Sequence, residues 1–294
     1  MTAIIRARGL SRHYGRFKAL DSIDLDIPAG RIVGLIGPNG AGKTTALKAI
    51  LGLSSYRGEL SVLGMNPSTQ RDQLMREVCF IADVAVLPRW ARVRQIIELT
   101  ERLHPRFSRE RCLHYLAATK IRQDARIKTL SKGMVVQLHL ALVMAIEARL
   151  LVLDEPTLGL DILFRKRFYS NLLNEYFDED RSILVTTHQV EEIEHILTDL
   201  IFIKEGQLVL NSSMDDIQAR YAELMVKPDR VDAARALGPI HERVLFGRHI
   251  FLYDRPDLEQ VQALGELHRP SIADLFVALM GNRETGASEL ESAA

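Results

Sequence analysis

The chain has 294 residues, of which 47% are hydrophobic and 26% are charged, a composition typical of a folded protein and not of a disordered one. Its 38 basic and 38 acidic side chains cancel, so the sequence lacks the broad positive charge of a general nucleic-acid binder. The longest uninterrupted apolar run, residues 140–146, is too short for a membrane-spanning helix, and residues 1–6 show no signal-peptide core.

Apolar segments alternate with helical patterns along the first two thirds of the chain. Residues 1–36 predict short strands separated by turns, and residues 93–130 have a mostly helical pattern. Further strands are predicted at residues 32–36, 78–82, 150–153, 182–186, 199–204 and 207–211, the last two as a hairpin around Glu205-Gly206. Apolar strands that alternate with helices predict an α/β fold with a parallel sheet.

The character of the sequence changes at about residue 214. Glycine and proline punctuate short segments there, which predicts a small α+β appendage, and residues 284–294 are small and acidic, as in a disordered tail. Ser271 is expected to cap a short helix whose apolar face docks on its own domain. That face consists of Ile272, Leu275, Phe276 and Leu279.

A glycine-rich loop follows the predicted strand 32–36. It matches the phosphate-binding pattern G-x-x-x-x-G-K-[ST] at every fixed position. Its residues are Gly37, Pro38, Asn39, Gly40, Ala41, Gly42, Lys43 and Thr44. Backbone N–H groups and the start of the next helix would surround phosphate oxygens, Lys43 would reach the β- and γ-phosphates, and Thr44 would ligate Mg²⁺. A chance glycine turn is the alternative, and the order of strand, loop and helix argues against it.

Two carboxylates follow the apolar strand 150–153. In an open α/β sheet ligands bind beyond the carboxyl ends of the strands, where the glycine-rich loop also lies. Asp154 is then suited to hold Mg²⁺ through its water shell, and Glu155 could orient and deprotonate the attacking water. An exposed acidic pair at a strand end is the alternative for these residues in isolation.

Together these motifs resemble the ATP-binding subunit of an ABC transporter, from about residue 4 to residue 211. Tyr14 resembles the aromatic residue that stacks on adenine, Asp161 the acid of the D-loop, and His188 the switch histidine that contacts the γ-phosphate. Ser131 and Gly133 resemble the LSGGQ signature, in which Lys132 replaces a glycine and Met134 a glutamine. In the family this segment faces the nucleotide of the other subunit. Ser131 could equally do no more than cap a buried helix.

The glutamine that the family places after a strand is absent. Asp83 follows the matching strand, and an aspartate can ligate Mg²⁺ directly but has a shorter reach and a negative charge. Asp83 is therefore a candidate metal ligand, with an ordinary acidic loop residue as the alternative. The resemblance also implies that Thr45, next to the phosphate loop, takes part in nucleotide binding.

The resemblance implies a fold and a domain order. The fold is a P-loop NTPase core with a parallel sheet, an N-terminal antiparallel β subdomain, a helical subdomain and a small α+β C-terminal appendage. The corresponding ranges are 1–213 for the ATPase domain, 84–130 for its helical subdomain, 214–283 for the accessory domain and 284–294 for the tail.

The implied function is ATP binding and hydrolysis, with Glu155, His188 and Lys43 as catalytic residues and ATP and Mg²⁺ as cofactors. The subunit would dimerise with itself or with a second ATPase subunit and power a multi-span permease from the cytoplasmic face of the membrane. Residues 269–279 resemble an ending common in ABC-2-type exporters. Trp90, in the helical stretch, could pack in a core or contact the permease. No nucleic-acid partner is expected.

Two alternatives to this function remain open on the sequence. One is a soluble ABC ATPase that acts on nucleic acid or the ribosome, although the neutral charge and the single cassette argue against it. The other is a subunit that binds ATP as a switch with little turnover, which Lys132 and Asp83 suggest. Cys79 and Cys112 lack the spacing of a zinc site or a disulfide framework and fit a reducing cytosol.

Overall fold

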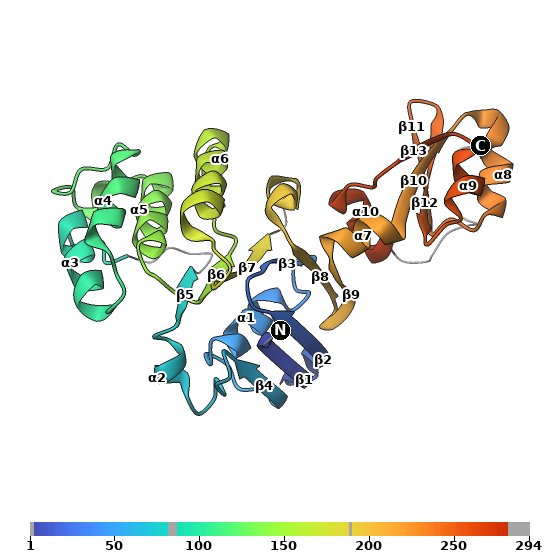
Figure 1. Ribbon diagram of the computed structural model, residues 1–294. Coiled ribbons are helices and arrows are strands. Elements are labelled where there is room, and N and C mark those ends of the chain that lie inside the picture. Colours follow the sequence, from blue (N-terminus) through green and yellow to red (C-terminus); the bar gives the residue numbers. More distant parts are fainter. Residues whose placement is uncertain (1–2, 82–86, 188–189, 282–294) are drawn as a thin grey trace. The chain divides into compact units, whose positions relative to one another are not determined.

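The computed structural model describes residues 3–81, 87–187 and 190–281 (Figure 1). The chain divides into two compact units, Met1–Asn211 and Ser212–Ala294. Each unit has an antiparallel sheet and a hydrophobic core of its own, and the first also contains a parallel sheet.

The first unit begins with an antiparallel sheet in the order β2-β1-β4. Its strands are β1 (Ala3–Tyr14), β2 (Phe17–Pro28) and β4 (Arg57–Val62). The prediction of several short strands here was wrong, because β1 and β2 are each 12 residues long and absorb their irregular residues as register shifts. On the exposed side Arg6 lies opposite Asp26, and its Nε is 3.1 Å from Asp26 Oδ1.

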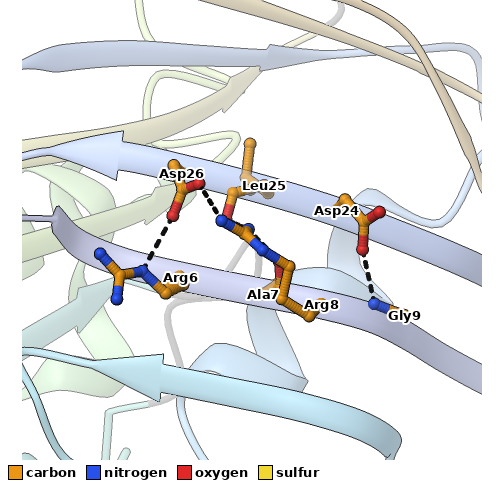
Figure 2. A network of polar contacts seen from close by, with 7 residues as sticks. All are labelled: Arg6, Ala7, Arg8, Gly9, Asp24, Leu25 and Asp26. Atoms are coloured by element: carbon orange, nitrogen blue, oxygen red, sulfur yellow. Dashed lines mark hydrogen bonds and ion pairs between the residues drawn. The ribbon is translucent and has the colours of Figure 1, made fainter.

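The exposed face of β1 and β2 carries the polar network drawn in Figure 2. Arg8 also pairs with Asp26, and the Gly9 N–H donates to Asp24 Oδ1 at 2.6 Å. The arginine and aspartate side chains of the pairs are 45–62% exposed, so solvent screens them and each contributes little to stability. We assign this network to the alignment of two strands and to nothing further.

A six-stranded sheet in the order β5-β6-β7-β3-β8-β9 forms the centre of the first unit. Its strands are β3 (Ile32–Ile36), β5 (Val78–Ile81), β6 (Leu150–Asp154), β7 (Ser182–Thr187), β8 (Asp199–Lys204) and β9 (Gln207–Ser213). Strands β5, β6, β7, β3 and β8 pair in parallel, as the sequence predicts. Residues of β3, β6 and β7 are buried along the whole strand, which explains the apolar run in each of them.

The register of this sheet places three strand ends together. Ile36 at the end of β3 lies opposite Thr187 at the end of β7, and Asp154 at the end of β6 lies opposite Thr186. The residues that follow β3 and β6 therefore leave the sheet at one edge. The predicted hairpin between β8 and β9 is confirmed, with both Glu205 and Gly206 at positive φ.

The helices of the first unit cover the sheet and extend beyond β5. They are α1 (Lys43–Ile50), α2 (Arg71–Leu74), α3 (Val93–Leu103), α4 (Arg109–Ala117), α5 (Lys132–Met144) and α6 (Ile162–Asn171), with short turns η1 (Ile127–Thr129), η2 (Leu172–Tyr176), η3 (Val190–Glu192) and η4 (Glu194–Ile196). Helix α1 packs on a core that contains Ile5, Leu47 and Leu51, all fully buried. Helices α3, α4 and α5 lie together in Figure 1.

The second unit is an antiparallel sheet in the order β11-β12-β10-β13 with short helices. Its elements are α7 (Met214–Arg220), β10 (Tyr221–Val226), η5 (Pro228–Arg230), α8 (Val231–Ala236), β11 (His241–Leu245), β12 (Arg248–Asp254), α9 (Leu258–Gln262), β13 (Glu266–His268) and α10 (Ile272–Met280). Leu224 and Phe251 form a core with residues of α8 and α9. Ser271 caps α10, as predicted, and Ile272 and Leu275 are buried.

Candidate functional site

The glycine-rich loop connects β3 to α1. Gly42 has a φ of +110°, and a Cβ there would lie 2.3 Å from the Ala19 carbonyl oxygen. A Cβ on Gly37 would lie 2.3 Å from the Ile203 carbonyl oxygen. Both contacts are too close for any side chain, so the base of the loop requires glycine for steric reasons.

The crown of this loop is open to solvent whereas its base is buried. Pro38, Asn39 and Gly40 are exposed, and Gly37 and Ala41 are buried. Helix α1 starts at this crown with neither a side-chain cap nor an acidic residue in its first turn. Its positive end is thus left for an external anion, as in phosphate-binding loops.

Lys43 is buried at the start of α1, with 8% of its surface exposed. Its Nζ donates to the carbonyl oxygens of Gly37 at 2.6 Å and Pro38 at 3.2 Å. Burial lowers the pKa of Lys43, and the negative charges of Glu155 and Asp154 oppose that shift. A cation held mainly by neutral carbonyl groups and near two carboxylates can turn toward a bound phosphate at little cost.

Asp154 is 5% exposed and accepts hydrogen bonds from two hydroxyl groups. Thr44 Oγ1 lies 3.2 Å from one carboxylate oxygen, and Thr186 Oγ1 lies 2.5 Å from the other. The carboxylate and the Thr44 hydroxyl thus meet beside the phosphate loop. Hard oxygen ligands of this kind are those that Mg²⁺ prefers, so these two residues fit a magnesium site.

Glu155, the next residue, has a φ of +48°, which is rare for a residue with a side chain. Its N–H donates to the Thr186 carbonyl oxygen at 3.1 Å and lies 3.3 Å from Thr186 Oγ1. Strained backbone of this kind persists only where the surroundings hold it, and it gathers at functional sites. Thr186 therefore positions both acids, and the sequence reasoning missed this role because Thr186 reads there as an ordinary strand residue.

Tyr14 ends β1 and is 47% exposed. The Arg12 guanidinium lies 4.6 Å from the centre of the Tyr14 ring. Hydrogen bonds from Arg12 and Ser54, together with the charges of Arg12 and Lys48, lower the pKa of the Tyr14 hydroxyl. Arg12 thus lies against the ring, while about half of the surface of Tyr14 stays accessible to a flat ligand.

Ser131, Gly133 and Asp161 form a second group. Ser131 Oγ accepts from Met134 N at 3.2 Å, so the predicted cap of α5 is confirmed. A Cβ on Gly133 would lie 3.6 Å from the Gly159 carbonyl oxygen, which brings the start of α5 next to the turn before α6. Asp161 caps α6 by accepting from Phe164 N at 2.9 Å.

Two of the candidate residues, Asp83 and His188, lie outside the residues that the structure describes. Thr45 lies in the first turn of α1 and is half-buried. Trp90 is 78% exposed, so the buried core role considered for it is wrong. Cys79 and Cys112 are free, and burial raises the pKa of both thiols to about 12, so they stay protonated.

Three comparisons with known proteins agree with this geometry. The sequence profile of the ABC transporter family matches residues 20–158. The chain is 31% identical to the Nod factor export ATP-binding protein I of Cupriavidus metallidurans, over 96% of this chain and 98% of that protein. It is 26% identical to a daunorubicin resistance ATP-binding protein of Streptomyces coeruleorubidus, over 98% of both chains.

Solved structures give the same result. The solved ATP-binding subunit of an ABC transporter matches with a TM-score of 0.68 and 25% identity, over 73% of this chain and 92% of that one. A nucleotide-free ATP-binding cassette matches in fold, with a TM-score of 0.62 and 18% identity, over 74% of this chain and 94% of that one. In the part of the chain that the structure describes, no helix has both the length and the apolar character needed to cross a bilayer. The chain is therefore an ATP-binding protein of the ABC transporter family.

Proposed function

We propose that this chain hydrolyses ATP and powers a membrane exporter through ATP-driven closure of a dimer. One observation carries the proposal. The phosphate loop with its buried Lys43, the Thr44–Asp154 pair and the strained Glu155 meet at one edge of the parallel sheet. Residues 1–213 would form the ATPase domain with its helical subdomain at 84–130, and residues 214–283 an accessory domain.

ATP would bind with its phosphates over the loop crown and its adenine on Tyr14. The N–H groups at the start of α1 would surround the phosphates, and Thr45 would add a hydroxyl there. Lys43 would leave the Gly37 and Pro38 carbonyl groups for the β- and γ-phosphates. Binding would thus exchange neutral partners of the lysine for charged ones.

Mg²⁺ would be held by Thr44 and Asp154, with Asp83 as a further candidate ligand. When bound, the ion neutralises charge on the β- and γ-phosphate oxygens. Thr186 keeps the Asp154 carboxylate oriented for this task. Because the carboxylate is buried and already hydrogen-bonded, little reorganisation is needed when the nucleotide arrives.

Glu155 would orient and deprotonate the attacking water, and His188 would contact the γ-phosphate. The positive φ of Glu155 turns the chain sharply after β6, and the two contacts of its N–H with Thr186 keep that turn in place. The side chain is half-buried, which leaves it accessible to a water molecule next to the phosphate loop.

A second subunit, identical or related, would complete each site with Ser131, Gly133 and Asp161. The close approach of Gly133 and Gly159 supports one continuous surface for that contact. A membrane permease would bind on the helical subdomain, where Trp90, Leu99 and Leu103 are 78%, 47% and 72% exposed. The subunit would then lie at the cytoplasmic face of the membrane, and the names of its relatives support export as the direction of transport.

The decisive test is the Glu155→Gln variant in the full chain, co-purified with its membrane partner. Loss of a general base lowers the rate typically about 10²- to 10⁴-fold, so steady-state hydrolysis should nearly stop while ATP still binds. ATP should also trap the variant as a closed dimer, which size-exclusion chromatography detects.

Glu179→Gln, at an exposed loop position, is the matched control and should hydrolyse ATP like the parent. If Glu155→Gln keeps the parent's rate, the role of Glu155 as the base is wrong. If the parent complex binds ATP with negligible turnover, the chain is a switch subunit and not an ATP hydrolase.

A further inference from the structure

A polar cluster that includes Thr157, three residues after the end of β6, has no role in the hydrolysis proposed above. It consists of Thr157, Arg165, Tyr169 and Glu192. Thr157 and Tyr169 are 4% and 2% exposed, and the side chains of Arg165 and Glu192 are 19% and 25% exposed. The fold therefore withdraws an ion pair and two hydroxyl groups from most of their water, which costs free energy unless their arrangement is specific.

Arg165 joins two segments that are separate in the sequence. Its Nη1 donates to Glu192 Oε1, and its Nε donates to the Leu160 carbonyl oxygen at 2.8 Å. Leu160 precedes Asp161, the residue assigned to the contact with the second subunit. Glu192 lies in η3, four residues after His188 in the sequence. One guanidinium thus holds the backbone of the first segment and a side chain of the second.

Thr157 adds a third segment to the cluster. It follows Glu155 by two residues, and its Oγ1 lies 3.5 Å from Glu192 Oε2 and 3.2 Å from the Tyr169 hydroxyl oxygen. The turn after the proposed base is therefore joined to Glu192 as well. The segments that carry Glu155 and Asp161 thus meet η3 at this cluster.

The chemistry of the pair indicates a function beyond holding the fold. A buried ion pair can usually be replaced by apolar side chains of similar volume without loss of stability, so its presence is weak evidence for a stabilising role. The charged pair instead fixes the relative positions of its partners, since a guanidinium has donors in fixed directions. One donor of Arg165 fixes the Leu160 carbonyl group next to Asp161, and another fixes Glu192 in η3.

We propose that Arg165 and Glu192 are positioning residues that link the D-loop turn of one subunit to the hydrolytic side of its own nucleotide site. The inference rests on the proposed function. Closure of the second subunit against Asp161 would shift the Leu160 backbone. Because Arg165 binds both the Leu160 carbonyl group and Glu192, the shift would move Glu192 and, through it, Thr157. Neither Arg165 nor Glu192 touches nucleotide in this mechanism.

The test uses Arg165→Lys and Glu192→Gln in the full chain, co-purified with its membrane partner. Lysine keeps the charge but cannot reach Leu160 and Glu192 together, and glutamine keeps the shape but loses the charge. We expect kcat to fall by about tenfold to a hundredfold, as for a small misplacement of catalytic groups. The Kd for ATP, measured on the isolated full chain, should stay within about twofold of the parent, because the proposal leaves nucleotide binding to other residues.

Two controls and a double variant separate positioning from a general structural defect. Arg167→Lys, on the same helix, and Glu191→Gln, on the same short turn, are exposed and should leave kcat unchanged. The double variant Arg165→Lys with Glu192→Gln should be no slower than the slower single variant, because the two residues act as one unit. Thermal unfolding of each variant shows whether it folds, and the near-isosteric Glu192→Gln remains informative if Arg165→Lys does not.

Three results would overturn the inference: unchanged kcat in both single variants, effects that multiply in the double variant, or a Kd for ATP that rises as much as kcat falls. In each case the parent still hydrolyses ATP, so the proposed function stands. A parent complex without hydrolysis instead defeats the proposed function and this inference with it.

Discussion

The phosphate-loop site of the first unit and the contact between β10 and α10 in the second unit hold charged side chains in opposite ways. In the first unit Lys43 donates to two backbone carbonyl groups, and Asp154 accepts from two threonine hydroxyl groups. In the second unit Arg243 pairs directly with Glu223 on β10 and with Asp274 on α10. A charged side chain whose partners are neutral can still attract a charged ligand. A charged side chain paired with one of opposite sign is already neutralised, and the pair joins two elements of the fold.

This difference separates a binding site from a structural joint within one chain. Asp274 also accepts from the Ser271 hydroxyl at 2.7 Å, so the pair in the second unit is tied to the cap of α10. Sequence composition does not distinguish the two cases, because both use common charged residues. The distinction predicts different responses to mutation in the two units.

The largest effect is expected for Lys43→Ala in the first unit. Loss of the cation should weaken ATP binding and hydrolysis together, each by at least about a hundredfold. Burial lowers the pKa of Lys43, whereas the alanine variant loses two hydrogen bonds of Nζ, so these two effects on the ligand-free stability oppose each other and we expect it to change far less than ATP binding. Thermal unfolding without and with ATP measures the ligand-free stability and ATP binding, and a steady-state assay measures hydrolysis. The exposed Lys166→Ala is the control. A normal ATP-induced shift in the variant would contradict this account of the loop.

Thr186→Val should have the next largest effect. The change removes the hydroxyl that Asp154 accepts from at 2.5 Å and leaves the shape of the side chain almost intact. We expect hydrolysis to fall by about tenfold and the free energy of unfolding to fall by about 1–3 kcal/mol, because the buried carboxylate loses a hydrogen bond. Steady-state rates and chemical denaturation test both values. Thr129→Val removes an exposed hydroxyl and should change neither of them, so an equal effect in both variants would refute the role of Thr186.

In the second unit Arg243→Leu should affect stability and leave ATP binding unchanged. The variant leaves Glu223, which is 8% exposed, and Asp274 without their shared cation. The arginine is partly exposed, so the expected loss is about 1–2 kcal/mol and not the larger cost of breaking a fully buried pair. Denaturation of the full chain measures this loss. A weakened affinity for ATP would show that Arg243 and its two acidic partners also affect nucleotide binding.

The smallest effect is expected for Glu223→Gln, and its sign depends on pH. Burial raises the pKa of Glu223, although the charge of Arg243 opposes the shift and that of Asp274 adds to it. The folded protein then keeps this proton to a higher pH than the unfolded chain, so this group's contribution to the free energy of unfolding falls as pH rises from about 4.5 to the raised pKa.

Glutamine does not titrate, so the variant should lack this fall in stability. It should therefore gain stability relative to the parent as pH rises from about 4 to about 7. Denaturation of parent and variant at the two pH values measures the gain. A larger fall in stability with pH in the variant than in the parent would show that the ionised carboxylate stabilises the fold.

Much of the first unit follows from local sequence. Each central strand has a run of at least three apolar residues because both faces are buried, so the positions of these strands were predicted to within about one residue. The prediction failed at β1 and β2, whose polar residues alternate irregularly because one face is exposed and the register shifts several times. The length of these strands depends on how they pair with each other, and the local sequence pattern does not show that pairing.

The residues of the candidate site also fall into two groups, those identified from the sequence and those that only the structure revealed. The phosphate loop, Asp154 and Glu155 were identified from sequence, because the loop is one contiguous pattern and the acids directly follow an apolar strand. The contacts that require glycine at positions 37 and 42 come from Ile203 and Ala19 and are tertiary. Thr186, Arg165 and Glu192 were not identified from sequence, because each acts through a partner between 5 and 32 residues away along the chain. The sequence by itself thus determined the family and the phosphate loop, because both are recorded in short contiguous motifs. Only the tertiary structure decided which charges are held by neutral groups and which by each other, because that depends on the register of the sheets and on distant segments that packing brings together.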